Sequence, residues 1–250
     1  MPDAPQPPAW NRARSGLNWA VRGLAGFLVA ALLTAFGFVG LIPLYGVPSP
    51  TRDQELALGN ALLALSWIVL LVDAASGLAY AVGLAGLWGT RRELGKEHAT
   101  SVEQTLHWLL VMLVLMAAGI LVPSITGPFL AFPGLGSAPP DWTTTLSVVL
   151  AGLRAIFAGL VLYYGVQALA AEDARVRLLV AMSLGVVGAI LWAGLAAYAV
   201  AGWTLALGSL LPFLVGLVAG LGTSAISLTL FILVYREVRS GLPTPPTSRS

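Results

Sequence analysis

The chain has 250 residues, of which 58% are hydrophobic and 10% are charged, and its mean hydropathy is +0.87. A typical soluble domain carries about 25% charged residues, so this composition argues against a soluble domain and predicts a multi-pass α-helical membrane protein. The absence of cysteine excludes a disulfide framework, a thiolate metal site and a cysteine nucleophile. The net charge of only +2 gives no reason to expect a nucleic-acid partner.

Six apolar segments are each long enough to cross a bilayer, which requires about 20 mostly apolar residues. The predicted fold class is therefore all-α, an integral membrane bundle of six transmembrane helices within residues 19–236. We expect residues 1–18 and 237–250, which are rich in Pro or polar residues, to be disordered tails. The predicted spans are residues 19–43, 56–89, 102–123, 143–170, 176–200 and 203–236.

The basic residues predict the orientation of these spans, because Lys and Arg collect on the cytoplasmic side of membrane proteins. With both termini inside, 11 of the 13 Lys and Arg residues lie at inner ends or in inner segments. Only Arg52 lies outside, and Arg154 falls within the fourth span. The sequence therefore predicts a multi-pass protein of the cell membrane with both termini in the cytoplasm.

Two ionisable residues lie deep in the predicted spans, Asp73 in the second and Arg154 in the fourth. Each precedes the next inner charge, Arg91 or Glu172, by 18 residues, which corresponds to a distance of about 27 Å along a helix. One unpaired charge at the bilayer centre costs about 2.5–3.5 kcal/mol. Equal depth and opposite sign therefore predict a buried ion pair. Such a pair would serve either as a structural lock for helix packing or as part of a solute or proton path.

The surroundings of Asp73 predict an inward-facing side chain. Ser66 and Tyr80 lie seven residues before and after it and share its helix face, and Ser76 flanks that face. These residues are candidates for the lining of a path through the bundle.

The sixth span is too long to cross the membrane perpendicularly, and it carries a stripe of small and polar residues at steps of three or four. Pro212 is expected to kink it. The stripe is typical either of a broken helix at a transport site or of close helix packing of the GxxxG kind. Its members are Ser209, Pro212, Gly216, Gly220, Thr223 and Ser227.

The sequence contains no nucleotide-binding loop, zinc-protease motif or serine-hydrolase elbow. The two histidines, His98 and His107, lie with Glu97 and Glu103 near the inner end of the third span, where polar residues at the membrane interface are expected in preference to a metal site. We therefore expect no cofactor and no catalytic activity.

Two segments, RRELGKEHATSVEQT and FAGLVLYYGVQALAAEDARVRLLVAMSLGVVGAIL, resemble parts of uncharacterised archaeal multi-pass membrane proteins with six spans. The resemblance covers about a third of the chain. It implies a prokaryotic cell membrane and carries no functional residue with it.

Two functional hypotheses follow from the sequence. The first is a small transporter or channel-like protein, with a path among the second, fourth and sixth spans near Asp73 and Arg154. The second is a non-catalytic scaffold or auxiliary subunit of a membrane complex, in which the pair and the small-residue stripe only set packing. The expected partners are the lipid bilayer, other membrane subunits or further copies of the chain.

Overall fold

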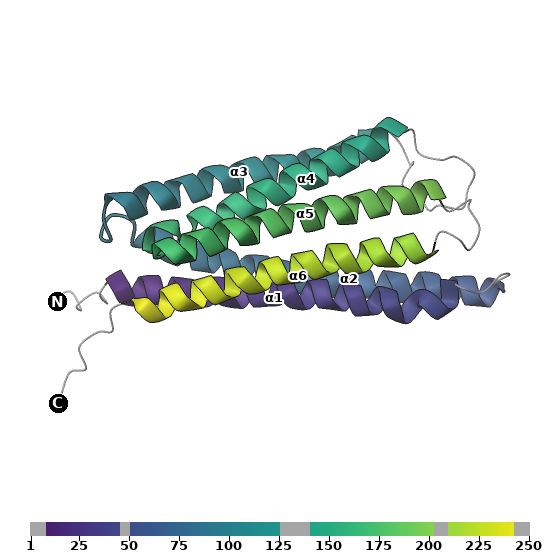
Figure 1. Cartoon of the computed structure of the whole chain (residues 1–250), viewed down its shortest axis with the longest axis horizontal. Coiled ribbons are helices and arrows are strands. Elements are labelled where there is room, and N and C mark those ends of the chain that lie inside the picture. Colours follow the sequence, from purple (N-terminus) through teal and green to yellow (C-terminus); the bar gives the residue numbers. More distant parts are fainter. Residues whose placement is uncertain (1–8, 46–50, 126–140, 203–209, 243–250) are drawn as a thin grey trace, which may run out of the picture.

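The computed structural model describes residues 9–45, 51–125, 141–202 and 210–242, and these residues form six α-helices that run roughly along one common direction (Figure 1). A short 3₁₀ helix, η1, lies between the fourth and fifth of them. The elements are α1 (Ala9–Tyr45), α2 (Arg52–Gly89), α3 (Lys96–Ile125), α4 (Asp141–Tyr164), η1 (Gln167–Leu169), α5 (Glu172–Gly202) and α6 (Leu210–Gly241).

Five stretches of these helices are long and apolar enough to cross a membrane. Over the described side chains α3 does not reach the same hydropathy, because its first three turns hold polar residues such as Glu97, Glu103 and His107. The prediction of an all-helical protein with apolar membrane-spanning helices is therefore confirmed at this coarser level. The five stretches are Ala9–Gly37, Arg52–Gly89, Gly152–Leu169, Glu172–Leu191 and Val218–Gly241.

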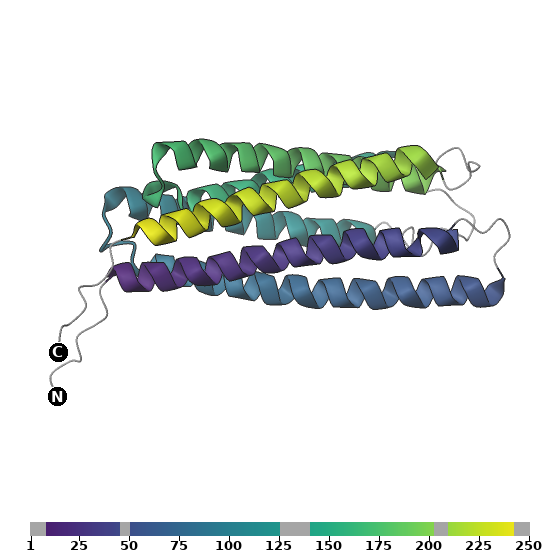
Figure 2. The same ribbon diagram turned by 60° about the horizontal axis from the view of Figure 1, so that its bottom comes forward.

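The helices follow one another across the bundle in the order α2, α1, α6, α5, α4 and α3. The helices α1 and α2 run side by side in both views (Figures 1 and 2), and α6 packs on the other side of α1. In contrast, α2 and α3 are neighbours in sequence and make few contacts in space. The start of α1 and the end of α6 meet, because Arg14 donates a hydrogen bond to the carbonyl of Leu242 at 2.5 Å.

Several helix ends differ from the predicted boundaries. Residues 9–18, expected in a disordered tail, form the first turns of α1, because Ala13 and Leu17 are fully buried in the core. Likewise α6 continues to Gly241, where Val238 is buried. The fourth helix ends at Tyr164 instead of residue 170. The helices α1 and α6 therefore extend beyond the predicted spans because the apolar side chains there are buried.

Local sequence signals set both ends of α2. Its first turn is closed by a capping box, in which the side chain of Thr51 accepts from the backbone of Gln54 at 3.4 Å and the side chain of Gln54 accepts from the backbone of Thr51 at 2.9 Å. At the other end, the cap residue Thr90 donates its backbone N–H to the carbonyl of Leu87 at 3.1 Å. Gly95, directly before α3, has a φ of +102°, a conformation that side chains rarely adopt. This glycine allows the chain to turn directly from α2 into α3.

Backbone-to-backbone packing of α1 on α2 is the closest helix contact described. A Cβ atom added at Gly83 would lie 2.6 Å from the backbone nitrogen of Ala20, and one added at Gly23 would lie 2.7 Å from the carbonyl oxygen of Ser76. Small residues permit such an approach, which supplies van der Waals attraction where lipid provides no hydrophobic driving force. The first half of α1 and the second half of α2 therefore form one tightly joined hairpin.

Replacing Gly83 with leucine is expected to destabilise the protein more than the same change at Gly77, which also lies in α2. The new side chain at Gly83 must displace the backbone of α1, whereas nothing lies within 4 Å of a Cβ added at Gly77. Overpacking of this kind costs about 1–3 kcal/mol. Heating the purified variants in detergent and measuring the folded fraction by size-exclusion chromatography gives the difference. Equal losses for the two variants would contradict this description of the α1–α2 interface.

Candidate functional site

A pair of buried tyrosines joins three helices in the half of the bundle where α1 begins and α6 ends. The hydroxyl of Tyr235 on α6 donates a hydrogen bond to the carbonyl of Leu162 on α4 at 2.7 Å. The hydroxyl of Tyr80 on α2 lies 3.0 Å from that of Tyr235. Since Tyr235 gives its single proton to Leu162, Tyr80 donates to Tyr235. We call this set, Tyr80, Tyr235 and the carbonyl of Leu162, the tyrosine junction.

The junction exists because α4 ends beside it. The last four carbonyls of a helix lack partners within the helix. Here the carbonyl of Leu162 accepts a hydrogen bond from Tyr235 of α6, and the carbonyl of Tyr164 accepts one from Ser101 of α3 at 2.5 Å. A Cβ at Gly165 would lie 2.7 Å from the hydroxyl oxygen of Tyr235, so a larger residue there would obstruct the contact.

Asp73 and Arg154 are not brought together. Within the residues described, the ion pairs are Arg12–Glu93 and Arg177–Glu237, and neither Asp73 nor Arg154 takes part in an ion pair or a hydrogen bond. The expected buried pair therefore does not form here. Its physical premise was incomplete: equal depth places two residues in one membrane layer but does not make their helices neighbours. In fact α2 packs on α1, and α4 packs between α3 and α5.

The two charges nevertheless lie on helices that both take part in the tyrosine junction. Tyr80 comes seven residues after Asp73 and shares its face. Val161, which is buried, comes seven residues after Arg154, one residue before the junction carbonyl of Leu162. Each charge therefore lies about 10 Å before the tyrosine junction along its own helix. Asp73 is half-buried there and Arg154 is exposed.

The other predicted path residues pack against neighbouring helices in most cases. Ser227 is buried and donates to the carbonyl of Ala181 on α5 at 2.6 Å. Thr223 and the backbone of Gly220 lie against Gly188 of α5, and Thr223 donates to carbonyls of its own helix. These contacts are close helix packing, which was one of the two interpretations of the α6 stripe.

On α2, Ser76 is buried against Gly26 of α1 and donates to the carbonyl of Val72 at 2.5 Å, while Ser66 lies on an exposed part of the helix. Ser209 lies outside the described residues.

The predicted kink at Pro212 falls at the edge of the described residues, so it stays a prediction. The described part of α6 starts at Leu210, two residues before Pro212. Further along, α6 is a continuous α-helix through Gly220, Gly222 and Ser224, where unwinding was the alternative.

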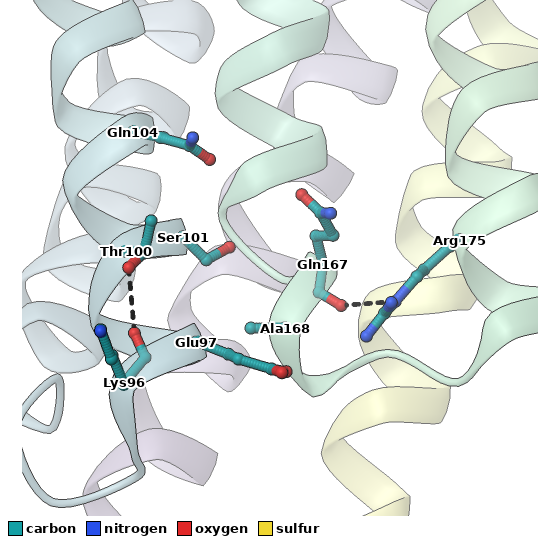
Figure 3. Close-up of a pocket in the computed structure, with 8 residues that line it drawn as sticks. All are labelled: Lys96, Glu97, Thr100, Ser101, Gln104, Gln167, Ala168 and Arg175. Carbon is teal, nitrogen blue, oxygen red and sulfur yellow. Dashed lines mark hydrogen bonds between the residues drawn. The ribbon is translucent and has the colours of Figure 1, made fainter.

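A polar pocket that the sequence did not indicate opens at the end of the bundle where α3 and α5 begin. It has a volume of about 410 Å³ and lies between the first turns of α3, the η1 segment and the start of α5 (Figure 3). One wall of the pocket is the chain after Tyr164, which includes η1. No local sequence motif predicts the conformation of this wall. The lining residues are Lys96, Glu97, Thr100, Ser101, Gln104, Gln167, Ala168 and Arg175.

His98 lies close to the pocket but belongs to the packing of the turn between α2 and α3. Its side chain is only 3% exposed, and its Nε2 lies 3.5 Å from the hydroxyl of Thr90. Burial lowers the pKa of His98, because the charged imidazolium is poorly solvated there. Among the residues described, no three His, Asp or Glu side chains are grouped so that they could hold a metal ion.

Comparison of the chain with protein-family models, curated proteins and solved structures finds no match.

Replacing Tyr235 with phenylalanine is expected to destabilise the protein more than replacing Tyr80 with phenylalanine. The first change leaves the carbonyl of Leu162 and the hydroxyl of Tyr80 without partners, at a cost of about 1–3 kcal/mol for each buried group. The second removes one hydroxyl and leaves the bond from Tyr235 to Leu162 intact. Thermal unfolding of both variants in the same detergent tests this order, and a larger loss for Tyr80→Phe would contradict it.

Stability is expected to fall as the pH is lowered below about 6.5, the unperturbed pKa of histidine. Because the folded-state pKa of His98 is lowered, the unfolded chain binds more protons in this window, so stability rises with pH and is lost on acidification. Melting temperatures of the parent and of His98→Gln between pH 8 and pH 5 measure the effect. The variant should show a weaker pH dependence, and an equally steep curve would contradict this role of His98.

Proposed function

We propose that the chain is a six-span integral membrane protein with both termini in the cytoplasm, and that it forms a path for a small polar or charged solute. Support for the orientation comes from the inner bias of Lys and Arg. It also comes from the contacts that join the start of α1 to the end of α6, Arg14 to Leu242 and Arg239 to Asn18. In this proposal the later, apolar part of α3 forms the third span. The total is then six spans, and a chain with both termini on the same side needs an even number.

One observation carries the proposed path. Asp73 and Arg154 lie in two of the stretches that are apolar and long enough to cross a membrane, they form no ion pair with described residues, and their helices α2 and α4 both take part in the tyrosine junction. A lone charge against lipid costs several kcal/mol, so such residues face water or a partner. Water between the two faces satisfies both charges. In this proposal the path is entered from the outer side, Asp73 and Arg154 contact the solute, and the tyrosine junction closes the inner end.

Cysteine reporters test the path cleanly, because the chain has no cysteine of its own. Asp73→Cys and Arg154→Cys are expected to react with a charged, membrane-impermeant thiol reagent added to the outer side of cells. Leu71→Cys is the matched control, since Leu71 is 66% exposed on α2 only two residues from Asp73 and points to another face. It should stay unreactive, because the charged reagent does not enter lipid. No reaction at either path position would overturn the proposed function.

A second candidate, a non-catalytic membrane subunit, is favoured by a different observation. Away from its contact with α1, α2 presents large apolar side chains, and Leu63, Leu71 and Leu78 are 59–70% exposed. A helix with so much free apolar surface suits a docked membrane partner as well as lipid. If the cysteine reporters are unreactive and the purified protein migrates with another chain on a native gel, this second function is supported instead.

A further inference from the structure

The polar pocket at the proposed inner end of the bundle has the volume of a small-molecule site, and its lining offers many polar groups to a ligand. Its volume of about 410 Å³ is within the range of about 300–1,000 Å³ typical of small-molecule sites. Seven of its eight lining residues are polar or charged, and Ala168 is the exception. They come from three separate elements, α3, η1 and α5, so the folded inner end is needed to assemble them (Figure 3).

The pocket offers cationic and amide donors from both sides. Lys96 lies on the α3 wall and Arg175 on the opposite wall (Figure 3). The Nε of Arg175 donates to the carbonyls of Gln167 at 3.1 Å and Ala170 at 3.2 Å, which anchors the side chain through one nitrogen. Its two terminal nitrogens make no hydrogen bond to described residues, and they remain available for an anion. The amides of Gln104 and Gln167 add neutral donors.

The same pocket also offers acceptors. The hydroxyl proton of Thr100 is given to the carbonyl of Lys96 at 3.1 Å, and that of Ser101 to the carbonyl of Tyr164 at 2.5 Å. Both hydroxyl oxygens therefore have only lone pairs left for a ligand. Glu97 adds a carboxylate that takes part in neither of the ion pairs found in the described part of the chain. A purely anionic ligand would leave this acceptor set unused and would be repelled by Glu97.

We propose that this pocket binds a zwitterionic group of the phosphoethanolamine type, in which a phosphate and a primary ammonium are a few bonds apart. The phosphate contacts Lys96 and Arg175, and the ammonium contacts Glu97. A phosphate accepts more hydrogen bonds than a carboxylate and matches the four donor groups. The group comes either from a lipid headgroup at the inner membrane surface or from a soluble molecule. The inference is independent of the proposed solute path.

Native mass spectrometry of the full chain in detergent tests the site. The probes are phosphatidylethanolamine, phosphatidylglycerol and phosphatidylcholine with identical acyl chains, and free phosphoethanolamine and inorganic phosphate. The parent should bind phosphatidylethanolamine about tenfold more tightly than the other two lipids, which is a difference of about 1.4 kcal/mol. If the bound group comes from a soluble molecule, phosphoethanolamine should bind more tightly than inorganic phosphate. In that case the three lipids should bind equally well. Either pattern supports the proposal and identifies the source.

Three exposed residues provide variants that leave the packing intact. Lys96→Gln should weaken binding of the preferred probe about tenfold, and Glu97→Gln should remove the preference for the ammonium-bearing probe. Arg92→Gln, which changes an exposed inner cation outside the pocket, should have no effect. The proposal is overturned if phosphatidylethanolamine is not preferred among the three lipids and phosphoethanolamine is not preferred over inorganic phosphate. It is equally overturned if Arg92→Gln and Lys96→Gln weaken binding alike.

Discussion

The hydrogen bond from Tyr235 to the carbonyl of Leu162 is the interaction on which the joining of α2, α4 and α6 depends. A helix that ends inside a protein must find donors for its last carbonyls, because an unpaired backbone group in a dry environment is costly. Here α4 obtains one donor from α6 and another from α3, through Ser101. The end of one helix is thereby bonded to two others, and Tyr80 adds α2 to the set.

Packing of backbone on backbone complements these polar contacts. The approach of α1 to α2 at Gly23 and Gly83 has its counterpart at the other side of the bundle, where Gly188 of α5 lies against Ser224 and the carbonyl of Gly220 on α6. Between these two hairpins α6 also contacts α1. Small residues thus determine which helices are neighbours, and the tyrosine junction determines where along their length the neighbours are held together.

The sequence predicted the helical class and the helix positions well, because long apolar runs leave few alternatives in a membrane. It also identified the α6 stripe, whose members Thr223 and Ser227 lie against α5. It failed on Asp73 and Arg154, since depth along a helix carries no information about which helices touch. The spacing of Gly16, Ala20 and Gly23 could have predicted the α1–α2 interface. The polar pocket had no such signal, because its wall is irregular chain after Tyr164.

The position of Tyr235 has a consequence for the order in which the protein is built. Helices enter the membrane from the N-terminus as they are synthesised, so the hairpin of α1 and α2 can assemble early from its own small residues. The carbonyl end of α4 lacks its donor until Tyr235 of α6 has been synthesised and inserted. Arg239 of α6 reaches Asn18 at the same stage. A nascent chain that stops before α6 therefore leaves the carbonyl of Leu162 without this partner, at the cost of an unpaired backbone group.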